Sequence, residues 1–215
     1  MAAREISVGG EVLGGEVLLE GLGSPEDWFQ EGPAKIEPRD NGFYIDATAG
    51  GYSAFWKKPL PANMLARYTC RVVPSEDSWH NINIISHCRP KVPGQWPIVE
   101  GGRYRGYREL ENYIVTFLKA NDEERAASGG CTGRQRLRRN PGFQLVEEKL
   151  VHPSEPGVDY RVTFAVRDGR VRYWIGEQPV FDWRDPEPIT GEGFFALRTW
   201  QTVSLYSDLL LLALD

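Results

Sequence analysis

The sequence has little of what metal centres and disulfide frameworks are built from, with three cysteines and three histidines among 215 residues. Cys70, Cys88 and Cys131 are odd in number and lack the short spacings of zinc sites. We expect reduced thiols, which are typical of a cytoplasmic protein. No metal or organic cofactor is expected. A structural Ca²⁺ ion stays possible because Asp-rich turns are present, although no Asp-x-Asp-x-Asp loop supports it.

Long apolar runs are also missing. The longest, residues 209–214, is far shorter than the roughly 18 residues that cross a bilayer. The first residues lack a basic start followed by an apolar segment, so no secretion signal is expected. The net charge of −5 argues against general affinity for nucleic acid or anionic membranes. These absences predict a cytoplasmic protein with neither of those partners.

Glycine, proline and aromatic residues are plentiful, with 23 Gly, 15 Pro, seven Trp and nine Tyr. Gly and Pro interrupt the chain at short intervals, and the segments between them favour β-branched and aromatic residues, which is typical of an all-β sandwich or barrel. We expect one domain over residues 1–215 and almost no helix. Strands are predicted at residues 42–47, 53–56, 66–73, 80–87, 111–118, 134–138, 160–167, 170–175, 194–197 and 203–213. The clearest hairpin turns at Asp168 and Gly169.

One predicted strand concentrates positive charge. Residues 134–138 carry an arginine at every second position, so a strand would place all three guanidinium groups on one face and Leu137 on the other. This arginine row consists of Arg134, Arg136 and Arg138. Like charges this close need protein carboxylates or an anionic ligand opposite them, and guanidinium groups suit carboxylates and phosphates. A solvated face with scattered ion pairs is the alternative.

Polar side chains also alternate along the segment 81–87. Asn81, Asn83 and His87 fall on one side of a regular strand, with Ile82 and Ile84 on the other. Asparagine amides can donate and accept hydrogen bonds at once, which fits sugar hydroxyls. His87 could exchange a proton near neutral pH, although a lone histidine is more often structural.

Acidic residues lie at the start of the predicted strand 111–118. Glu111 and Tyr113 share a face, and Glu109 joins them if the strand begins earlier. Two carboxylates at this spacing are similar to the acid pair of retaining glycosidases, but the expected third acidic residue is absent. We favour Glu109 as an ion-pair partner of the arginine row.

Several segments together resemble a known family. They are EDWFQEGPAKI, SAFWKKPLP, NINIISH, YRGYRELENYIV, TGRQRLRRNPGF and WIGEQPVFDWRDPEPITGEGFFALRTW. From Asp27 to its end, the chain resembles the YesU-like bacterial proteins of the concanavalin A-like lectin and glucanase superfamily. The arginine row running into Asn140 and Pro141 is the most distinctive part of this resemblance.

The resemblance implies an antiparallel two-sheet jelly-roll sandwich with a concave, ligand-facing sheet. It also implies a set of residues that converge across a cleft: Asn83, His87, Tyr113, Arg136 and Arg138, with Tyr107 and Trp200 at the rim. The family is associated with the breakdown of plant or algal polysaccharide, so the expected partner is an oligosaccharide or polysaccharide. The oligomeric state is not predicted.

The favoured function is cleavage of an acidic glycan by β-elimination. Arg136 and Arg138 would neutralise the uronate carboxylate, and His87 or Tyr113 would remove the proton at C5. Tyr107 or Tyr113 would protonate the leaving oxygen.

Two alternatives stay open. One is a glycoside hydrolase that uses Glu109 and Glu111. The other is a non-catalytic, lectin-like module that binds sugar through aromatic rings and through the amide and guanidinium groups of the same strands.

Overall fold

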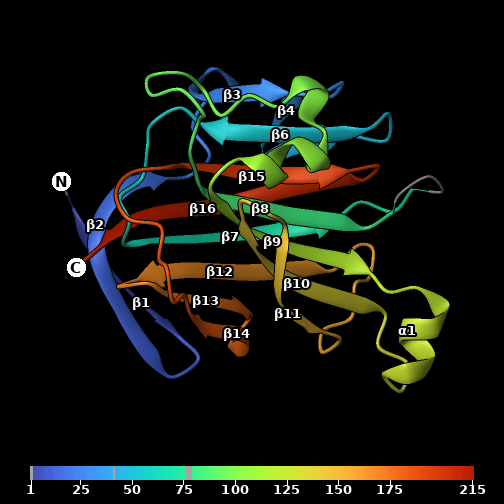
Figure 1. Ribbon diagram of the computed structural model, residues 1–215. Coiled ribbons are helices and arrows are strands. Elements are labelled where there is room, and N and C mark those ends of the chain that lie inside the picture. Colours follow the sequence, from blue (N-terminus) through green and yellow to red (C-terminus); the bar gives the residue numbers. More distant parts are fainter. Residues whose placement is uncertain (1, 41, 76–78) are drawn as a thin grey trace.

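Two antiparallel β-sheets packed face to face make up the computed structural model, which describes residues 2–40, 42–75 and 79–215 (Figure 1). Within these residues, sheet A has nine strands: β1 (Ala3–Val8), β2 (Glu11–Glu20), β4 (Ile36–Arg39), β5 (Gly42–Asp46), β7 (Met64–Val72), β12 (Asp159–Arg167), β13 (Arg170–Ile175), β14 (Gln178–Arg184) and β16 (Val203–Leu214). Seven described strands form sheet B: β3 (Trp28–Glu31), β6 (Gly51–Trp56), β8 (Asn81–Cys88), β9 (Asn112–Lys119), β10 (Gly133–Asn140), β11 (Gln144–Lys149) and β15 (Phe194–Trp200). The all-β, two-sheet antiparallel sandwich expected from the sequence is confirmed.

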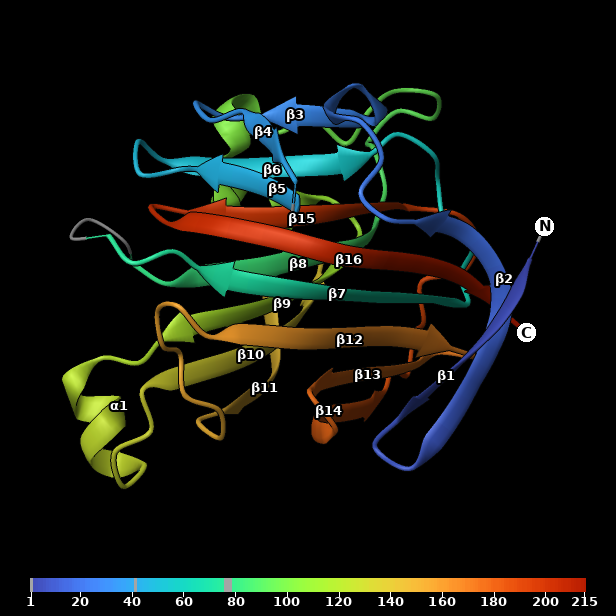
Figure 2. The same cartoon turned by 180° about the vertical axis from the view of Figure 1, so that it is seen from behind.

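In both sheets, strands that are far apart in the sequence lie next to one another. Sheet B runs β11-β10-β9-β8-β15-β6-β3 and faces the viewer in Figure 1. Sheet A runs β1-β2-β16-β7-β12-β13-β14, with β5 pairing to β16 and β4 to β5, and faces the viewer in Figure 2. Six strands that the sequence did not predict are β1, β2, β3, β4, β11 and β14.

The main core lies between the sheets, where the alternate side chains of each strand meet. Leu137, Ile82, Ile84 and Phe164 are buried there, as alternation along their strands predicts. Trp174 is buried as well, but in a second cluster that the β1–β2 hairpin covers. Sheet A is therefore apolar on part of both faces. The outer face of sheet B carries a third apolar cluster, formed with the loop between β8 and β9, and polar groups beside it.

Helical structure is sparse, as expected. In the part of the chain that the structure describes, it comprises α1 (Asp122–Ala127) and the short 3-10 turns η1 (Pro25–Asp27), η2 (Glu100–Gly102) and η3 (Tyr104–Glu109). The helix α1 was not predicted. Its start is fixed by a reciprocal cap in which the Asn121 side chain accepts from the Glu124 N–H (2.8 Å) and the Glu124 carboxylate accepts from the Asn121 N–H (2.9 Å).

The predicted hairpin between β12 and β13 is also confirmed. Asp168 and Gly169 have φ angles of 50° and 75°. Positive φ at both central residues gives the turn whose twist matches that of the flanking strands.

The long loop between β8 and β9 covers one end of sheet B. Its turns η2 and η3 lie in front of β6 and β15 (Figure 1). Glu31 of β3 holds the loop: its carboxylate accepts from the Val99 N–H (2.7 Å) and from the Tyr107 hydroxyl (2.6 Å). Gly102, at φ 62°, lies so close to the backbone of Glu31 and Gly51 that a side chain would be crowded there. The loop is therefore packed against sheet B, and we call residues 89–111 the loop wall.

No helix formed by the described residues is long and apolar enough to cross a membrane.

Candidate ligand-binding cleft

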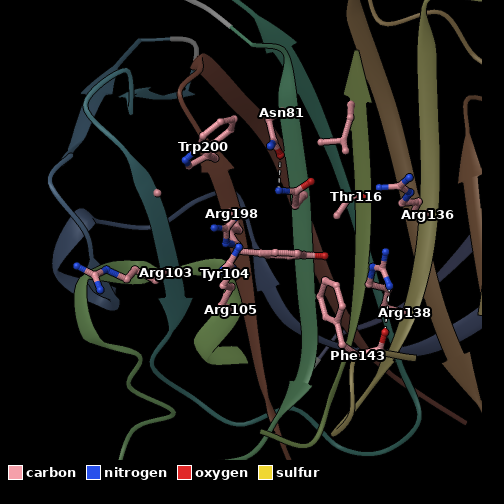
Figure 3. A pocket seen from close by; sticks show the side chains of 13 residues that line it. Asn81, Arg103, Tyr104, Arg105, Thr116, Arg136, Arg138, Phe143, Arg198 and Trp200 are labelled. Atoms are coloured by element: carbon pink, nitrogen blue, oxygen red, sulfur yellow. Dashed lines mark hydrogen bonds between the residues drawn. The ribbon is translucent and has the colours of Figure 1, made fainter. Parts of the chain in front are cut away.

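A cleft of about 490 Å³ opens on the outer face of sheet B, between the strands and the loop wall (Figure 3). This volume falls within the range of pockets that bind small ligands. The residues that line it are Gly51, Asn81, Asn83, Arg103, Tyr104, Arg105, Thr116, Leu118, Arg136, Arg138, Phe143, Arg198 and Trp200. We refer to this site as the cleft.

The floor of the cleft is built by strand register. Thr116 of β9 pairs with Arg136 on one side and with Asn83 on the other, and Asn83 pairs with Arg198 of β15. Residues directly opposite one another in an antiparallel sheet share a face. Four strands therefore place one row of polar side chains across the cleft: Arg136, Thr116, Asn83 and Arg198.

The arginine row does occupy one face, and it ends in the cleft. Its first members are balanced by carboxylates, because Arg134 is ion-paired with Glu124 and Arg136 with Glu148. Arg138 instead donates to the Phe143 carbonyl (3.0 Å) and stacks on the Phe143 ring at 3.9 Å. No carboxylate among the described residues pairs with Arg138, so its charge is available to a ligand.

Arg198 places a second unbalanced charge beneath the cleft. Its side chain is only 2% exposed, and burial lowers the pKa of its guanidinium. The guanidinium lies 4.8 Å from the centre of the Tyr104 ring, and Nη2 donates to the Gly102 carbonyl at 3.4 Å. With the side-chain amide of Asn83 oriented so that its oxygen faces Arg198, that oxygen accepts from Nη1 at 3.2 Å. The described residues supply no carboxylate partner, so a positive potential reaches the cleft through a medium of low polarity.

Tyr104, on η3, lies between these two guanidinium groups. In Figure 3 its ring extends across the cleft from Arg198 toward Arg138 and Phe143. Burial raises the pKa of its hydroxyl above the ordinary value of 10, while the nearby Arg138 and Arg198 lower it in part. The phenol is therefore protonated at neutral pH and can donate a hydrogen bond to a ligand.

Five residues predicted from the sequence do line the cleft. They are Asn81, Asn83, Arg136, Arg138 and Trp200. Trp200 stands at the rim with 36% of its surface exposed, as the resemblance implied. The other five predicted site residues lie elsewhere.

His87 faces the core between the sheets, so its predicted place on the cleft face was wrong. Its φ of 55° and a register shift opposite β15 reverse the alternation at the end of β8. Nε2 lies 2.9 Å from the Ala62 carbonyl, and Nδ1 lies 2.8 Å from the Ser86 hydroxyl. Burial lowers its pKa to about 4. His87 is therefore a neutral, hydrogen-bonded core residue.

Tyr113 also points away from the cleft. It pairs in register with Arg139 rather than with a member of the arginine row, and so shares the face of Arg139. Its hydroxyl donates to the Asp185 carboxylate (2.6 Å), to which Arg139 Nε donates as well (3.0 Å). Its ring contacts that of His87 edge-on at 5.5 Å. We call His87, Tyr113, Arg139 and Asp185 the inner polar cluster.

The remaining predicted residues lie around the loop wall. Tyr107 is fully buried behind the wall, not at the rim. Glu111 pairs with Arg89 (2.8 Å) and with Arg139 (3.4 Å). Glu109 is ion-paired with Lys91, so its expected pairing with the arginine row was wrong. Neither glutamate lines the cleft.

Arg198, Tyr104 and Phe143 are cleft residues that the sequence reasoning missed. Arg198 could have been found, because it lies two residues before Trp200 in one strand and therefore on the same face. Tyr104 lies in the long aromatic loop, whose length and composition indicate function, but no pattern predicts which of its rings faces the sheet.

A metal site has no support from side-chain grouping. Among the residues described, no three His, Cys, Asp or Glu side chains are arranged as metal ligands. The structural Ca²⁺ ion considered from the sequence stays a prediction.

Comparison with known proteins identifies the family. Residues 45–209 match the model of the family described as Domain of unknown function (DUF6250), which is more than half of the chain. The chain belongs to this family. No sequence among the curated proteins matches this DUF6250 chain.

Solved structures share the fold of this DUF6250 protein. A Bacillus subtilis protein of unknown function with a galectin-like fold has a TM-score of 0.72 at 17% identity, and the match covers 99% of each chain. The carbohydrate-binding module CBM66 from Bacillus subtilis has a TM-score of 0.58 at 9% identity, covering 86% of this chain and 95% of the module. The VIP36 exoplasmic/lumenal domain, in its Ca²⁺/Man3GlcNAc-bound form, has a TM-score of 0.60 at 12% identity, covering 88% and 84%. The fold is therefore a galectin-like, concanavalin A-like sandwich.

Proposed function

We propose that this DUF6250 protein binds an acidic oligosaccharide in the cleft on sheet B. The observation that carries the proposal is the charge of the described lining: five residues are arginines (Arg103, Arg105, Arg136, Arg138 and Arg198) and none is acidic. Such a concentration of guanidinium groups in a protein of net charge −5 favours an anionic ligand. The carboxylate of a uronic acid has the planar shape that guanidinium groups bind with two parallel hydrogen bonds.

The other lining residues suit the sugar part of the ligand. Tyr104, Phe143 and Trp200 offer aromatic surface, and tyrosine and tryptophan combine an apolar ring with a polar edge. Asn81 and Asn83 add amide groups that can donate to and accept from hydroxyls. Two structural neighbours are a carbohydrate-binding module and a lumenal domain bound to Man3GlcNAc, which supports carbohydrate as the ligand class.

Cleavage by β-elimination is the second candidate, and Tyr104 is the observation that favours it. In this reaction a base removes the C5 proton of the uronate, the C4–O bond breaks, a C4–C5 double bond forms, and the leaving oxygen takes a proton. The Tyr104 phenol, flanked by Arg138 and Arg198, would donate that last proton. The described lining contains no carboxylate, histidine or lysine to act as the base, so we rank binding first.

The glycoside hydrolase alternative has the least support. Glu109 and Glu111 lie outside the lining and are held in ion pairs with Lys91, Arg89 and Arg139. The cytoplasmic location, the exclusion of nucleic acid and membrane as partners, and the membership of the YesU-like group stay predictions.

Titration calorimetry with oligogalacturonides tests the proposal. Arg138→Gln should weaken binding about 10- to 100-fold, the effect expected when one charge-assisted hydrogen bond is lost. Arg167→Gln, an exposed arginine on sheet A, is the matched control and should bind as the wild type does. Equal affinity of the Arg138 variant and the wild type, or equal affinity for neutral and acidic oligomers, would contradict the proposal.

The same samples distinguish binding from cleavage. Elimination creates a double bond conjugated to the carboxylate and so produces new ultraviolet absorbance during incubation. Absorbance that Tyr104→Phe abolishes would establish the lyase. Tight binding with neither new absorbance nor new reducing ends would establish a binding module.

A further inference from the structure

Two exposed tryptophans lie together at one end of the cleft: Trp200, which lines it, and Trp79, which lies beyond the lining. Trp200 ends β15 at the rim, and Trp79 lies just before β8 with 62% of its surface exposed. Their ring centres are 5.7 Å apart and the ring planes meet at 56°, so the two rings form one angled apolar surface. Figure 3 shows Trp200 and Asn81 together at one end of the cleft, opposite Phe143 and Arg138.

Hydrogen bonds hold the backbone at Trp79 and in the segments that follow both rings. The Trp79 N–H donates to the Gln201 carbonyl (2.8 Å), which ties the segment before β8 to the turn after β15. The Asn81 N–H donates to the Thr202 hydroxyl (2.9 Å), and that hydroxyl donates to the Trp200 carbonyl (2.8 Å). Contiguous exposed apolar surface beside polar residues indicates a ligand-binding groove, whereas single exposed apolar side chains do not.

We propose that Trp79 and Trp200 form a platform for a further sugar ring of the same oligosaccharide. This inference rests on the proposed function. A sugar ring presents C–H groups on its faces and hydroxyls at its edge, so it can lie on an indole while its hydroxyls reach polar neighbours. Asn81 stands beside the platform. One polar atom of its side-chain amide faces Asn83, and the other has no protein partner among the residues described, so it can bind such a hydroxyl.

The platform sets the length and position of the ligand. Register with β9 places Arg138 opposite Ile114 and Asn81 opposite Leu118, so the two ends of the cleft are separated by four strand residues, or about 13 Å. The acidic sugar lies near Arg138 and Tyr104, and the chain runs toward Trp200 and Trp79. The protein therefore binds several linked sugars rather than a single one.

The test measures the affinities of oligogalacturonides of increasing length for the wild type and for Trp79→Ala. Wild-type affinity should rise with length and then level off once the chain covers the platform. In Trp79→Ala the longer oligomers should bind roughly tenfold more weakly, while the shortest that binds should be unaffected. Trp79→Phe, which keeps an aromatic ring, should recover most of the loss. Val12→Ala, at a similarly exposed position on sheet A, is the control.

Each outcome decides a different point. Wild-type binding that improves with length and is unchanged in Trp79→Ala overturns the platform and leaves the proposed function intact. If neutral oligosaccharides bind instead and depend on Trp79, the platform stands and the acidic specificity is overturned. If no oligosaccharide of either kind binds the wild type, both proposals fail.

Discussion

Two groups of polar side chains lie on opposite faces of sheet B, and they differ in how their charges are balanced. In the inner polar cluster each ionisable side chain has a protein partner: Asp185 accepts from Tyr113 and Arg139, and His87 is bonded to Ser86 and Ala62. In the cleft, Arg138 and Arg198 have no carboxylate partner among the described residues. His87 and Tyr113 drew attention in the sequence as proton-exchanging residues, but here they are hydrogen-bonded to Ala62 and Asp185 on the inner side of sheet B. The guanidinium groups that lack a carboxylate partner are the feature that distinguishes the cleft from the inner polar cluster.

The largest expected effect comes from breaking the inner polar cluster. Asp185→Ala leaves Arg139, whose side chain is 14% exposed, without its nearest counter-charge, and removes the acceptor of Tyr113. Loss of one partner of a buried ion pair typically costs about 3–5 kcal/mol of unfolding free energy. Chemical denaturation measures it. Asp182→Ala, which breaks an exposed pair with Arg170, should cost less than about 1 kcal/mol. Similar losses of unfolding free energy in both variants would show that the inner polar cluster stabilises the fold no more than an exposed ion pair does.

An intermediate effect is expected from protonating His87. Its folded-state pKa, about 4, lies below that of an unfolded histidine, so its contribution to stability is complete above pH ~6.5 and is lost as the pH falls toward 4. The difference corresponds to about 3 kcal/mol. Unfolding measured from pH 7 to pH 4 should show a shallower decline in His87→Gln than in the wild type. Parallel curves would mean that groups other than His87 account for the decline.

The smallest effect on stability is expected in the cleft. Arg138→Gln removes a charge that has no carboxylate partner and lies near other arginines, so its unfolding free energy should change by less than about 1 kcal/mol. The same variant should lose affinity for acidic oligomers, as proposed above. A stability loss as large as that of Asp185→Ala would assign Arg138 a structural role and remove the contrast between the two faces.

Alternation along single strands predicted much of this arrangement. In β10 it separated the arginine row from Leu137, because one apolar residue among charged ones shows which face is buried. In β9 the rule failed, since Tyr113 is as suitable for a core as for a cleft. Only the register, which pairs Tyr113 with Arg139, decides which face it takes.

Other parts of the site depend on features that alternation does not encode. The left-handed backbone at His87 reverses the end of β8, and no sequence pattern marks that position as it would a glycine. Tyr104 reaches the cleft on a loop whose course is set by contacts with β3 and β6. Arg198 was overlooked although its strand was predicted, because the predicted strand ended at Leu197.

The hydrogen bonds that the buried Glu31 carboxylate accepts from Val99 and Tyr107 affect how fast a ligand can enter the cleft. A cleft wall that is already ordered loses little conformational entropy when a ligand arrives. For the proposed acidic oligosaccharide, association would then not wait for a loop to close, and its rate would be set by diffusion and by the attraction between the guanidinium groups and the incoming anion. That attraction weakens at higher salt concentration, because the ions screen the charges. Differences in affinity among related oligosaccharides should accordingly appear mainly in how slowly each one leaves.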